Sequence, residues 1–121
     1  GDRMFSSSVQ DNPDVISYAS SFSKGGDIGM VLINKGTTSA MSIIDIKNFK
    51  QGAKYYYYTL SGGDGGDFSR KVLVNGQSPT GPSGGPAYGS VKAKSGALTA
   101  PSVKVEIPAR SVVYLMVEKA K

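Results

Sequence analysis

The stretch that most constrains the fold is residues 54–76, KYYYYTLSGGDGGDFSRKVLVNG, in which four successive tyrosines precede a loop rich in glycine and aspartate. Aromatic side chains suit a pleated strand and alternate between its two faces. The alternation predicts two opposed sets of side chains, Tyr56, Tyr58 and Leu60 on one face and Tyr55, Tyr57 and Thr59 on the other. A strand that is apolar on both faces needs cover on both, one from its own core and the other from a second sheet, a loop, a partner or a ligand. The second face is therefore the main indication of function in the sequence.

The rest of the chain consists of short apolar segments separated by connections rich in glycine, proline, serine and threonine. Such segments at regular spacing are typical of strands in an antiparallel sandwich. Besides the tyrosine strand, the predicted strands cover residues 15–22, 28–34, 38–49, 69–75, 88–94, 103–107 and 111–118. We therefore predict an all-β fold, a single antiparallel β-sandwich of about eight strands, immunoglobulin-like or jelly-roll-like, over residues 14–121. Residues 1–13, rich in serine and turn formers, are predicted to be a linker that leads into it.

Several of these strands also have a predicted inner side. The run 28–34, IGMVLIN, is nearly all apolar, which is typical of a strand buried on both sides. Residues 103–107 alternate cleanly, with their three apolar side chains inward and their two charged side chains outward. The segment 88–94 offers a weaker core face around Tyr88, and residues 95–101 are predicted to form a turn.

The chain contains no histidine and no cysteine. Their absence removes the usual general base, the usual transition-metal ligand, thiolate chemistry and every Ser-His or Cys-His dyad. A carboxylate pair is the remaining route to hydrolysis, and the sequence has only two glutamates, Glu106 and Glu118. They belong to separate strands, and Glu106 is on the solvent side of its strand, so ordinary surface charge is the favoured interpretation. We expect no catalytic residue and no cofactor, and a small hydrolase is the least favoured alternative.

The net charge of +5 does not predict a nucleic-acid partner, because the 14 lysines and arginines are scattered singly between strands. Such a charge also suits binding to sulfated or otherwise acidic polysaccharide. No apolar stretch approaches the ~20 residues that a membrane-spanning helix needs, so we expect no membrane span.

The glycine-rich loop after the tyrosine strand carries two carboxylates, Asp64 and Asp67. Two carboxylates on a flexible backbone, with carbonyls and water, are a weak candidate for a calcium site, but the loop lacks the ligand number of an EF-hand. Glycines that supply positive φ in a tight connection, with Asp67 capping local amides, are the favoured interpretation. We therefore predict no metal site.

Tyr55 and Tyr57 are the strongest candidates for contact with a sugar or a neighbouring domain, because an aromatic ring can stack on the apolar face of a pyranose. Phe68 and Arg70 are added to this set, since Arg70 and Lys71 beside an aromatic ring suit an acidic substrate, although a solvated turn edge is the default interpretation of these basic residues. Packing competes with this role, because a buried tyrosine contributes about 1.5 to 3 kcal/mol through its apolar area alone. The absence of tryptophan, the largest stacking platform, also favours packing.

The strings YYYYTLSGGDGGDFSRKVLVNG at 55–76, GGP at 84–86 and VKVEIPARSVVYLMVE at 103–118 together resemble the C-terminal β-sandwich of polysaccharide-degrading glycoside hydrolases of the agarase and β-porphyranase type. The string GMVLINKG at 29–36 is similar to the early core strand of that family. The resemblance covers residues 14–118, nearly the whole chain.

The resemblance implies a non-catalytic accessory domain, because in that family the sandwich follows a (β/α)8 catalytic barrel whose strands carry the catalytic glutamates. The implied partner is that barrel, and the implied location is secreted, periplasmic or at the cell surface, where polysaccharide is found. We expect the chain to be a piece of a longer protein, with Gly1 left from its excision. The alternative is a carbohydrate-binding module that contacts galactan-type polysaccharide through exposed tyrosines.

Overall fold

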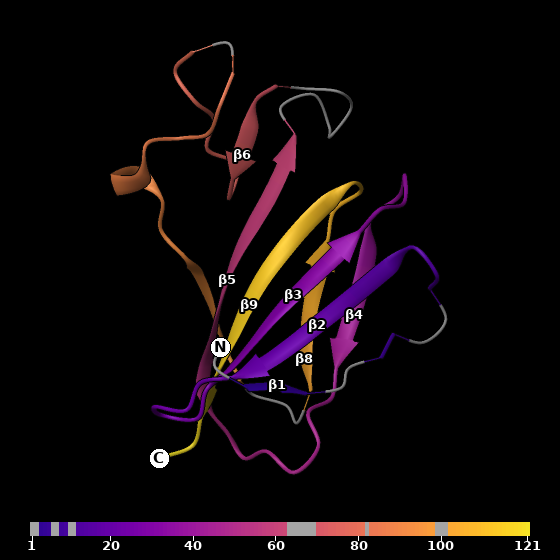
Figure 1. Ribbon diagram of the computed structural model, residues 1–121, viewed down its shortest axis with the longest axis vertical. Helices are drawn as coiled ribbons and strands as arrows, with labels where there is room; N and C mark the ends of the chain where they lie inside the picture. The colour runs from indigo at the N-terminus through magenta and orange to yellow at the C-terminus, as the bar shows by residue number, and fades with distance from the viewer. Residues whose placement is uncertain (1–2, 6–7, 10–11, 63–69, 82, 99–101) are drawn as a thin grey trace.

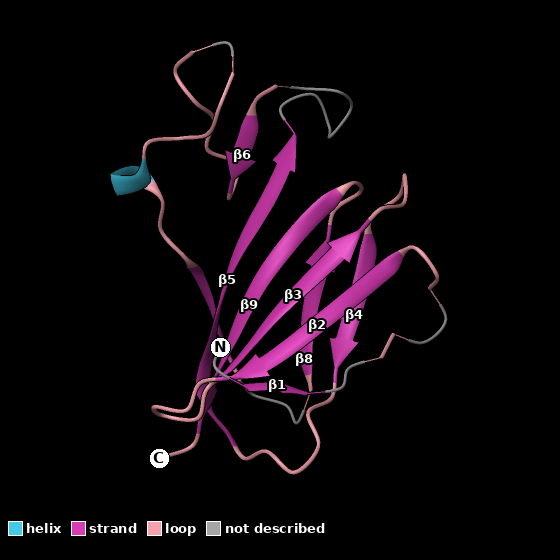
Figure 2. Cartoon of the chain, in the orientation of Figure 1, coloured by secondary structure: helices cyan, strands magenta, loops and turns pink. Residues whose placement is uncertain are grey.

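The computed structural model describes residues 3–5, 8–9, 12–62, 70–81, 83–98 and 102–121. Within this part of the chain it contains nine strands and one turn of 3-10 helix, η1 (Tyr88–Ser90) (Figures 1 and 2). The strands are β1 (Arg3–Phe5), β2 (Val15–Ser21), β3 (Ile28–Asn34), β4 (Ala40–Ile44), β5 (Gln51–Gly62), β6 (Val72–Val74), β7 (Lys94–Ala97), β8 (Val103–Ile107) and β9 (Ser111–Lys119). None of the described segments forms a helix long and apolar enough to cross a bilayer.

The strands form two antiparallel sheets, which confirms the predicted all-β sandwich. The large sheet has the order β1-β2-β3-β9-β5-β6, with β7 also paired to β5, and the small sheet consists of β4 and β8. Strand β5 pairs along one edge with β9 and along its other edge with β7 and β6 in succession. In Figure 1 the small sheet lies behind β2, β3 and β9, so the opposite surface of the large sheet faces the viewer.

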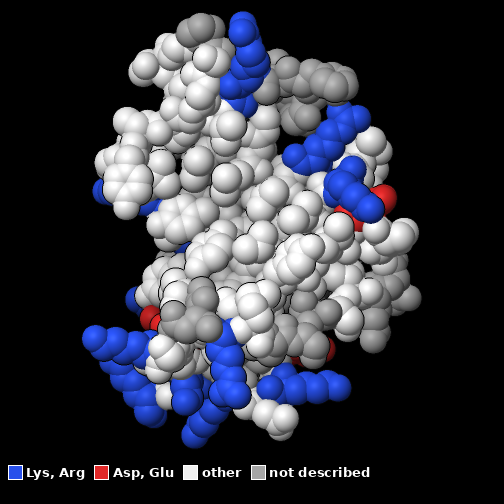
Figure 3. All heavy atoms as spheres, viewed as in Figure 1, with Lys and Arg blue, Asp and Glu red and all other residues white. Residues whose placement is uncertain are grey.

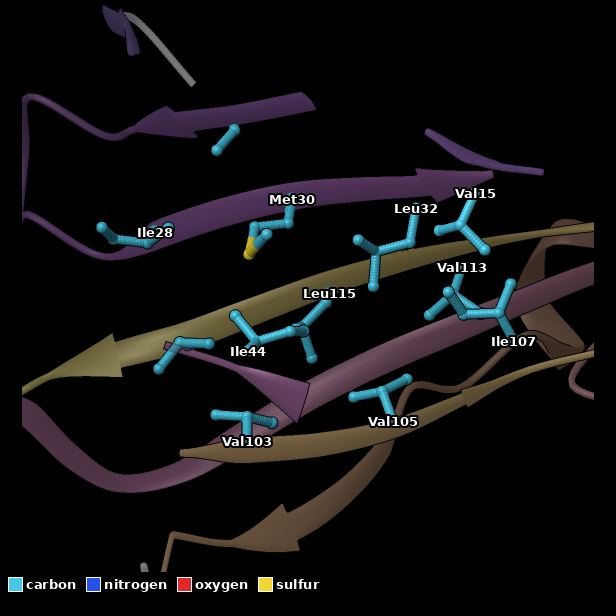
Figure 4. Close-up of a cluster of buried hydrophobic side chains, with 12 residues drawn as sticks. Val15, Ile28, Met30, Leu32, Ile44, Val103, Val105, Ile107, Val113 and Leu115 are labelled. Atoms are coloured by element: carbon cyan, nitrogen blue, oxygen red, sulfur yellow. The ribbon is translucent and has the colours of Figure 1, made fainter. Parts of the chain in front are cut away.

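The core lies between the two sheets, where alternate side chains of β3, β8 and β9 meet (Figure 4). In β8 the buried residues are Val103, Val105 and Ile107, as the alternation in the sequence predicts. Every second residue of β9 from Ser111 to Val117 is likewise buried, and the residues between them are partly exposed. Burial of apolar side chains on one face of each sheet therefore holds the layers together.

One buried polar side chain, Asn34, joins the two layers at the end of β3. It is only 2% exposed, and its amide nitrogen donates hydrogen bonds to the carbonyl oxygens of Thr38 at 2.8 Å and Ile107 at 3.0 Å. Its amide oxygen accepts a hydrogen bond from the backbone nitrogen of Gly36 at 2.9 Å. A buried polar group is tolerated where its hydrogen bonds are satisfied, so Asn34 fixes the register between the large sheet and the β4–β8 pair.

Three predicted strands differ from the structure, and in the first of them, residues 69–75, the described residues form a strand only over β6. The segment 38–49 is a strand only over β4, because the chain turns after Ile44, and Asn48 takes a positive φ of 57°. The segment 88–94 was predicted as a strand with a core face at Tyr88, but Tyr88 begins η1 and is 96% exposed. The strand in this region is β7, which begins at the last residue of the predicted strand and otherwise falls within the predicted turn, because pairing with β5 gives its backbone hydrogen bonds.

Part of the segment predicted as a linker is also a strand. Strand β1 pairs antiparallel with β2, with Met4 opposite Ser20, and forms an edge of the large sheet. Its three residues carry no clear strand pattern in the sequence, and the free edge of β2 supplies their partner.

Candidate functional site

The candidate site is the surface of the large sheet that faces away from the small sheet, here called the outer face. Its residues alternate with those of the core along β2, β3, β9 and β5. The large apolar and aromatic members are Ile16, Tyr18, Val31, Ile33, Val112, Tyr114, Met116, Tyr56, Tyr58 and Leu60. All of them are at least partly exposed, so no segment that the structure describes covers the outer face completely.

Strand pairing arranges these side chains in rows across the sheet. One row runs through Tyr18, Val31, Tyr114 and Tyr58, which are direct neighbours on successive strands. A second row runs through Ile16, Ile33, Val112 and Leu60, and ends at Val74 on β6. Cross-strand neighbours lie close enough for their side chains to touch, so the two rows form one continuous apolar surface.

The two rows make up most of the outer face. Four strands about 4.8 Å apart, and the two rows about 6.8 Å apart along the strands, cover roughly 260 Å². Neither of the two rows contains a charged residue, and Figure 3 shows lysine, arginine and acidic side chains gathered around this surface instead of on it. The largest apolar patch of an ordinary monomer is itself about 300 to 600 Å² and is often functional, so the outer face is the candidate surface for contact with another molecule or domain.

One end of the outer face is polar. The hydroxyl group of Tyr56 donates a hydrogen bond to Oε1 of Glu118 at 3.0 Å. This hydrogen bond, followed by burial and by the negative charges of Glu118 and Asp27, raises the pKa of Tyr56 above its ordinary value. Tyr56 therefore stays protonated through the neutral range and acts as a donor that closes this end of the face.

The predicted contact residues Tyr55 and Tyr57 lie on the other side of β5, as the alternation predicts. Both are half-buried and pack against the edge of the core. Their rings are stacked, with centroids 6.1 Å apart and planes at 22°. The ring of Tyr55 lies directly over Gly96 of β7, where a β-carbon would collide with it. Their contact with a sugar or a domain stays a prediction.

Of the remaining predicted site residues, the structure describes only Arg70. Arg70 is exposed beside β6, and its carbonyl oxygen accepts a hydrogen bond from the backbone nitrogen of Gly84 at 2.9 Å. Phe68, Asp64 and Asp67 lie outside the described residues. Among the residues that are described, no group of three or more acidic or other metal-ligating side chains is placed to hold a metal ion.

The two glutamates lie on opposite surfaces of the sandwich. Glu106 is exposed on β8 of the small sheet and accepts a hydrogen bond from the hydroxyl group of Ser39 at 2.7 Å. Glu118 belongs to β9 and engages Tyr56 at the end of the outer face. The two residues are on different sheets and do not form the facing pair of carboxyl groups that glycoside hydrolysis requires.

Sequence reasoning found the second apolar face of β5 but not the residues that share it. The near-continuous apolar run in β3 was interpreted as burial on both sides, which is wrong for its outer side, because Val31 and Ile33 are partly exposed. Tyr18 and Tyr114 were not selected as site residues. In the sequence both tyrosines alternate with the apolar residues that form the core. Only the strand order shows that they lie beside Tyr58.

Neither a protein-family model nor a curated protein matches this chain. Three similar solved structures are CelM2, a bifunctional glucanase-xylanase from a metagenome library, a GH30 endoxylanase from Clostridium papyrosolvens C71, and a thermostable GH51 α-L-arabinofuranosidase from Thermotoga petrophila RKU-1. Their TM-scores are 0.62, 0.60 and 0.55, at 19%, 14% and 19% sequence identity, over 91%, 95% and 91% of this chain. Glycoside hydrolases contain this fold.

The similarity covers only a small part of those enzymes. This chain spans 17%, 23% and 20% of their respective lengths. At such low identity the comparison shows a shared fold, and the activity of the larger proteins does not transfer to this chain with it.

Proposed function

We propose that this chain is a non-catalytic accessory domain of a polysaccharide-degrading glycoside hydrolase, and that its outer face packs against a (β/α)8 catalytic barrel. The observation that carries the proposal is the partly exposed apolar outer face on a β-sandwich of a fold that glycoside hydrolases contain. The resemblance of the sequence to the agarase and β-porphyranase type supplies the proposed class of parent enzyme. A secreted, periplasmic or cell-surface location follows from that class.

The outer face can contribute substantially to such an interface. Burying the two apolar rows, roughly 260 Å², at about 25 cal/mol per Å² gives about 6.5 kcal/mol before the costs of ordering and desolvation are subtracted. Two domains of one chain also avoid most of the entropy cost of association, because the linker keeps them at high effective concentration. A stable interdomain contact therefore needs only part of this energy.

The experiment compares two lysine substitutions in the full-length parent enzyme. Tyr18→Lys changes the outer face, and Met41→Lys changes the outside of the small sheet, where Met41 is 65% exposed. Tyr18 is itself 53% exposed, so both variants of the isolated chain are expected to unfold close to the wild type. In the parent enzyme, Tyr18→Lys is expected to lower the thermal midpoint and to increase proteolysis between the domains, while Met41→Lys leaves both unchanged. Equal behaviour of the two variants in the parent enzyme contradicts the proposal.

A carbohydrate-binding module is the second candidate, because the stacked rings of Tyr55 and Tyr57 remain partly exposed. Two rings in i, i+2 positions on one strand offer a platform for the apolar faces of a sugar chain. Affinity electrophoresis in agarose, porphyran and other galactans tests this function. Retardation that is lost in Tyr57→Ala supports it, and unchanged mobility of the wild-type chain in all of these gels excludes it for those glycans.

A further inference from the structure

An open pocket lies at one end of the sandwich, away from the stacked tyrosines, and it adjoins the outer face at Phe22, whose ring lies over Gly29 beside the hydroxyl group of Tyr114. It is formed where the β2–β3 turn, the β4–β5 connection and the end of β9 meet, and its volume is about 480 Å³. Phe22, Ile28, Ile46 and Phe49 supply its apolar lining. A volume of this size falls within the range of small-molecule sites, and it is large enough for one or two sugar rings.

Three lysines from two separate segments surround this apolar lining. Lys47 and Lys50 come from the β4–β5 connection, and Lys119 is the last residue of β9. The same end of the molecule carries a gathering of lysine and arginine side chains in Figure 3. Lys24 of the β2–β3 turn and Lys121 at the C-terminus add to the positive charge of this end.

The walls of the pocket are connected by hydrogen bonds. The backbone nitrogen of Phe22 donates to the carbonyl oxygen of Asp27 at 2.9 Å, which closes the β2–β3 turn. The backbone nitrogen of Lys119 donates to Oδ1 of Asp27 at 2.9 Å. The backbone nitrogen of Ala120 donates to the carbonyl oxygen of Lys50 at 2.8 Å. These bonds tie the three segments together, so the lysines are presented by a connected frame.

The position of Lys119 depends on a glycine. Gly26 has a φ of +77°, and a β-carbon built on it would lie 2.8 Å from Cδ and 3.3 Å from Nζ of Lys119. The absence of a side chain at Gly26 therefore lets the aliphatic part of Lys119 lie across the turn, with its ammonium group beside the pocket. The two carboxylates closest to Gly26 and Lys119 in the sequence each accept a hydrogen bond from another group. Asp27 accepts from the backbone nitrogen of Lys119, and Glu118 accepts from the hydroxyl group of Tyr56.

We propose that this pocket binds an acidic sugar unit of a polysaccharide, one that carries a sulfate or a carboxylate. The partly exposed side chains of Ile46 and Phe49 take the apolar face of the sugar, and the lysine ammonium groups form charge-assisted hydrogen bonds with its anionic group. A nucleic acid fits less well, because its repeated phosphates need a basic track with stacking positions along it, whereas here the charges converge on one pocket. Its three lysines lie outside the two apolar rows of the outer face, so their substitution leaves unchanged the rows that are proposed to contact a barrel.

The test is affinity electrophoresis of the complete 121-residue chain in gels that contain a sulfated galactan, a uronate-bearing xylan or neutral agarose. The site variant is Lys47→Gln with Lys50→Gln, and the matched control is Lys35→Gln with Lys104→Gln, two exposed lysines outside the pocket. Both variants remove the same charge, and thermal unfolding checks that both remain folded. A charge-assisted hydrogen bond is worth about 1.5 to 3 kcal/mol, so the site variant is expected to bind an acidic polysaccharide about tenfold or more weakly than the control.

The expected result is retardation by at least one acidic polysaccharide, little by agarose, and a selective loss in the site variant. The polysaccharide that retards the chain identifies the anionic group as sulfate or carboxylate. Equal weakening by both variants shows a bulk-charge effect and overturns the proposal. Unchanged mobility in both gels that contain an acidic polysaccharide also overturns it. So does binding to single-stranded DNA, used as a further probe, if the site variant weakens that binding selectively and to the same extent. None of these outcomes affects the Tyr18→Lys comparison in the parent enzyme, so the two proposals fail separately.

Discussion

Two adjacent residues of β9 test which side of the large sheet is core and which is the outer face. Leu115 is 0% exposed and lies between Met30 on β3 and Tyr57 on β5. Met116 is the next residue, belongs to the outer face, and is partly exposed. The test compares Leu115→Ala with Met116→Ala in the isolated chain, in which no partner domain covers the outer face.

The expected destabilisation differs strongly between the two variants. Truncation of a fully buried leucine costs about 2 to 5 kcal/mol, because lost transfer energy adds to the cavity that remains, and about 3 kcal/mol is a central value. Met116 already contacts water, so Met116→Ala is expected to cost less than about 1 kcal/mol. For 121 residues the unfolding entropy is about 0.25 kcal/mol per kelvin. The thermal midpoint therefore falls by about 12 °C for Leu115→Ala and by less than about 4 °C for Met116→Ala.

The assay is reversible thermal unfolding followed by circular dichroism, with urea unfolding as a second measure of the free energy. The same variant also tests the proposed interface. In the parent enzyme, where a partner is proposed to cover the outer face, Met116→Ala is expected to destabilise the protein more than it does in the isolated chain. Equal losses for Leu115→Ala and Met116→Ala in the isolated chain would refute the assignment of the two faces. An equal loss of stability for Met116→Ala in the isolated chain and in the parent enzyme would instead contradict the proposed interface.

Three further predictions concern single side chains. Asn34→Ala removes three hydrogen bonds at the junction of the sheets and is expected to lower the free energy of unfolding by about 2 to 4 kcal/mol in urea titrations, whereas loss of less than about 0.5 kcal/mol would contradict its role. Tyr56 has a raised pKa in the folded chain, so its contribution to stability is complete below pH 10 and declines as the pH rises above it. Spectrophotometric titration should show a late tyrosine that is absent in Tyr56→Phe and titrates earlier in Glu118→Gln, and unchanged titration in both would refute the assignment. Gly96→Ala collides with the ring of Tyr55 and is expected to cost about 1 to 3 kcal/mol in thermal unfolding, an expectation that a neutral result would overturn.

The sequence predicted the strands that carry their own pattern. Strand β8 alternates because one face meets the core and the other meets water, and the tyrosine strand is specified by aromatic residues that suit a pleated sheet. Strand β3 coincides with its predicted range, since an apolar run of seven residues bounded by turn formers has the length of a strand and is short for a helix. These signals are local, so they are readable without knowledge of the partner strands.

The misplaced elements lack such a local signal. Strand β7, KSGA, contains a single apolar residue, and its conformation depends on hydrogen bonds with β5 and on the space that Gly96 leaves for Tyr55. Strand β1 likewise depends on the free edge of β2. Their backbone groups pair with residues far away in the chain, and no window of sequence contains both partners.

The candidate site divides in the same way. The presence of a second apolar face followed from four successive tyrosines, because alternation sends neighbours to opposite sides of any strand. The identity of that face did not follow, since it required the order β2-β3-β9-β5, which places Tyr18, Tyr114 and Tyr58 in one row. The pocket lined by three lysines could not be predicted from the sequence either. Lys47 and Lys119 are far apart in the chain, and they line one pocket only because β9 ends beside the β4–β5 connection.

The sequence by itself determined that this chain forms strands and lacks the side chains of most catalytic mechanisms, because both properties depend on residue type and on spacing along the chain. The tertiary structure alone decided which apolar side chains are hidden and which remain exposed, because exposure depends on what lies above a residue in space. That the small sheet covers one side of β2, β3 and β9, and not the other, is the difference between a core and a surface for binding.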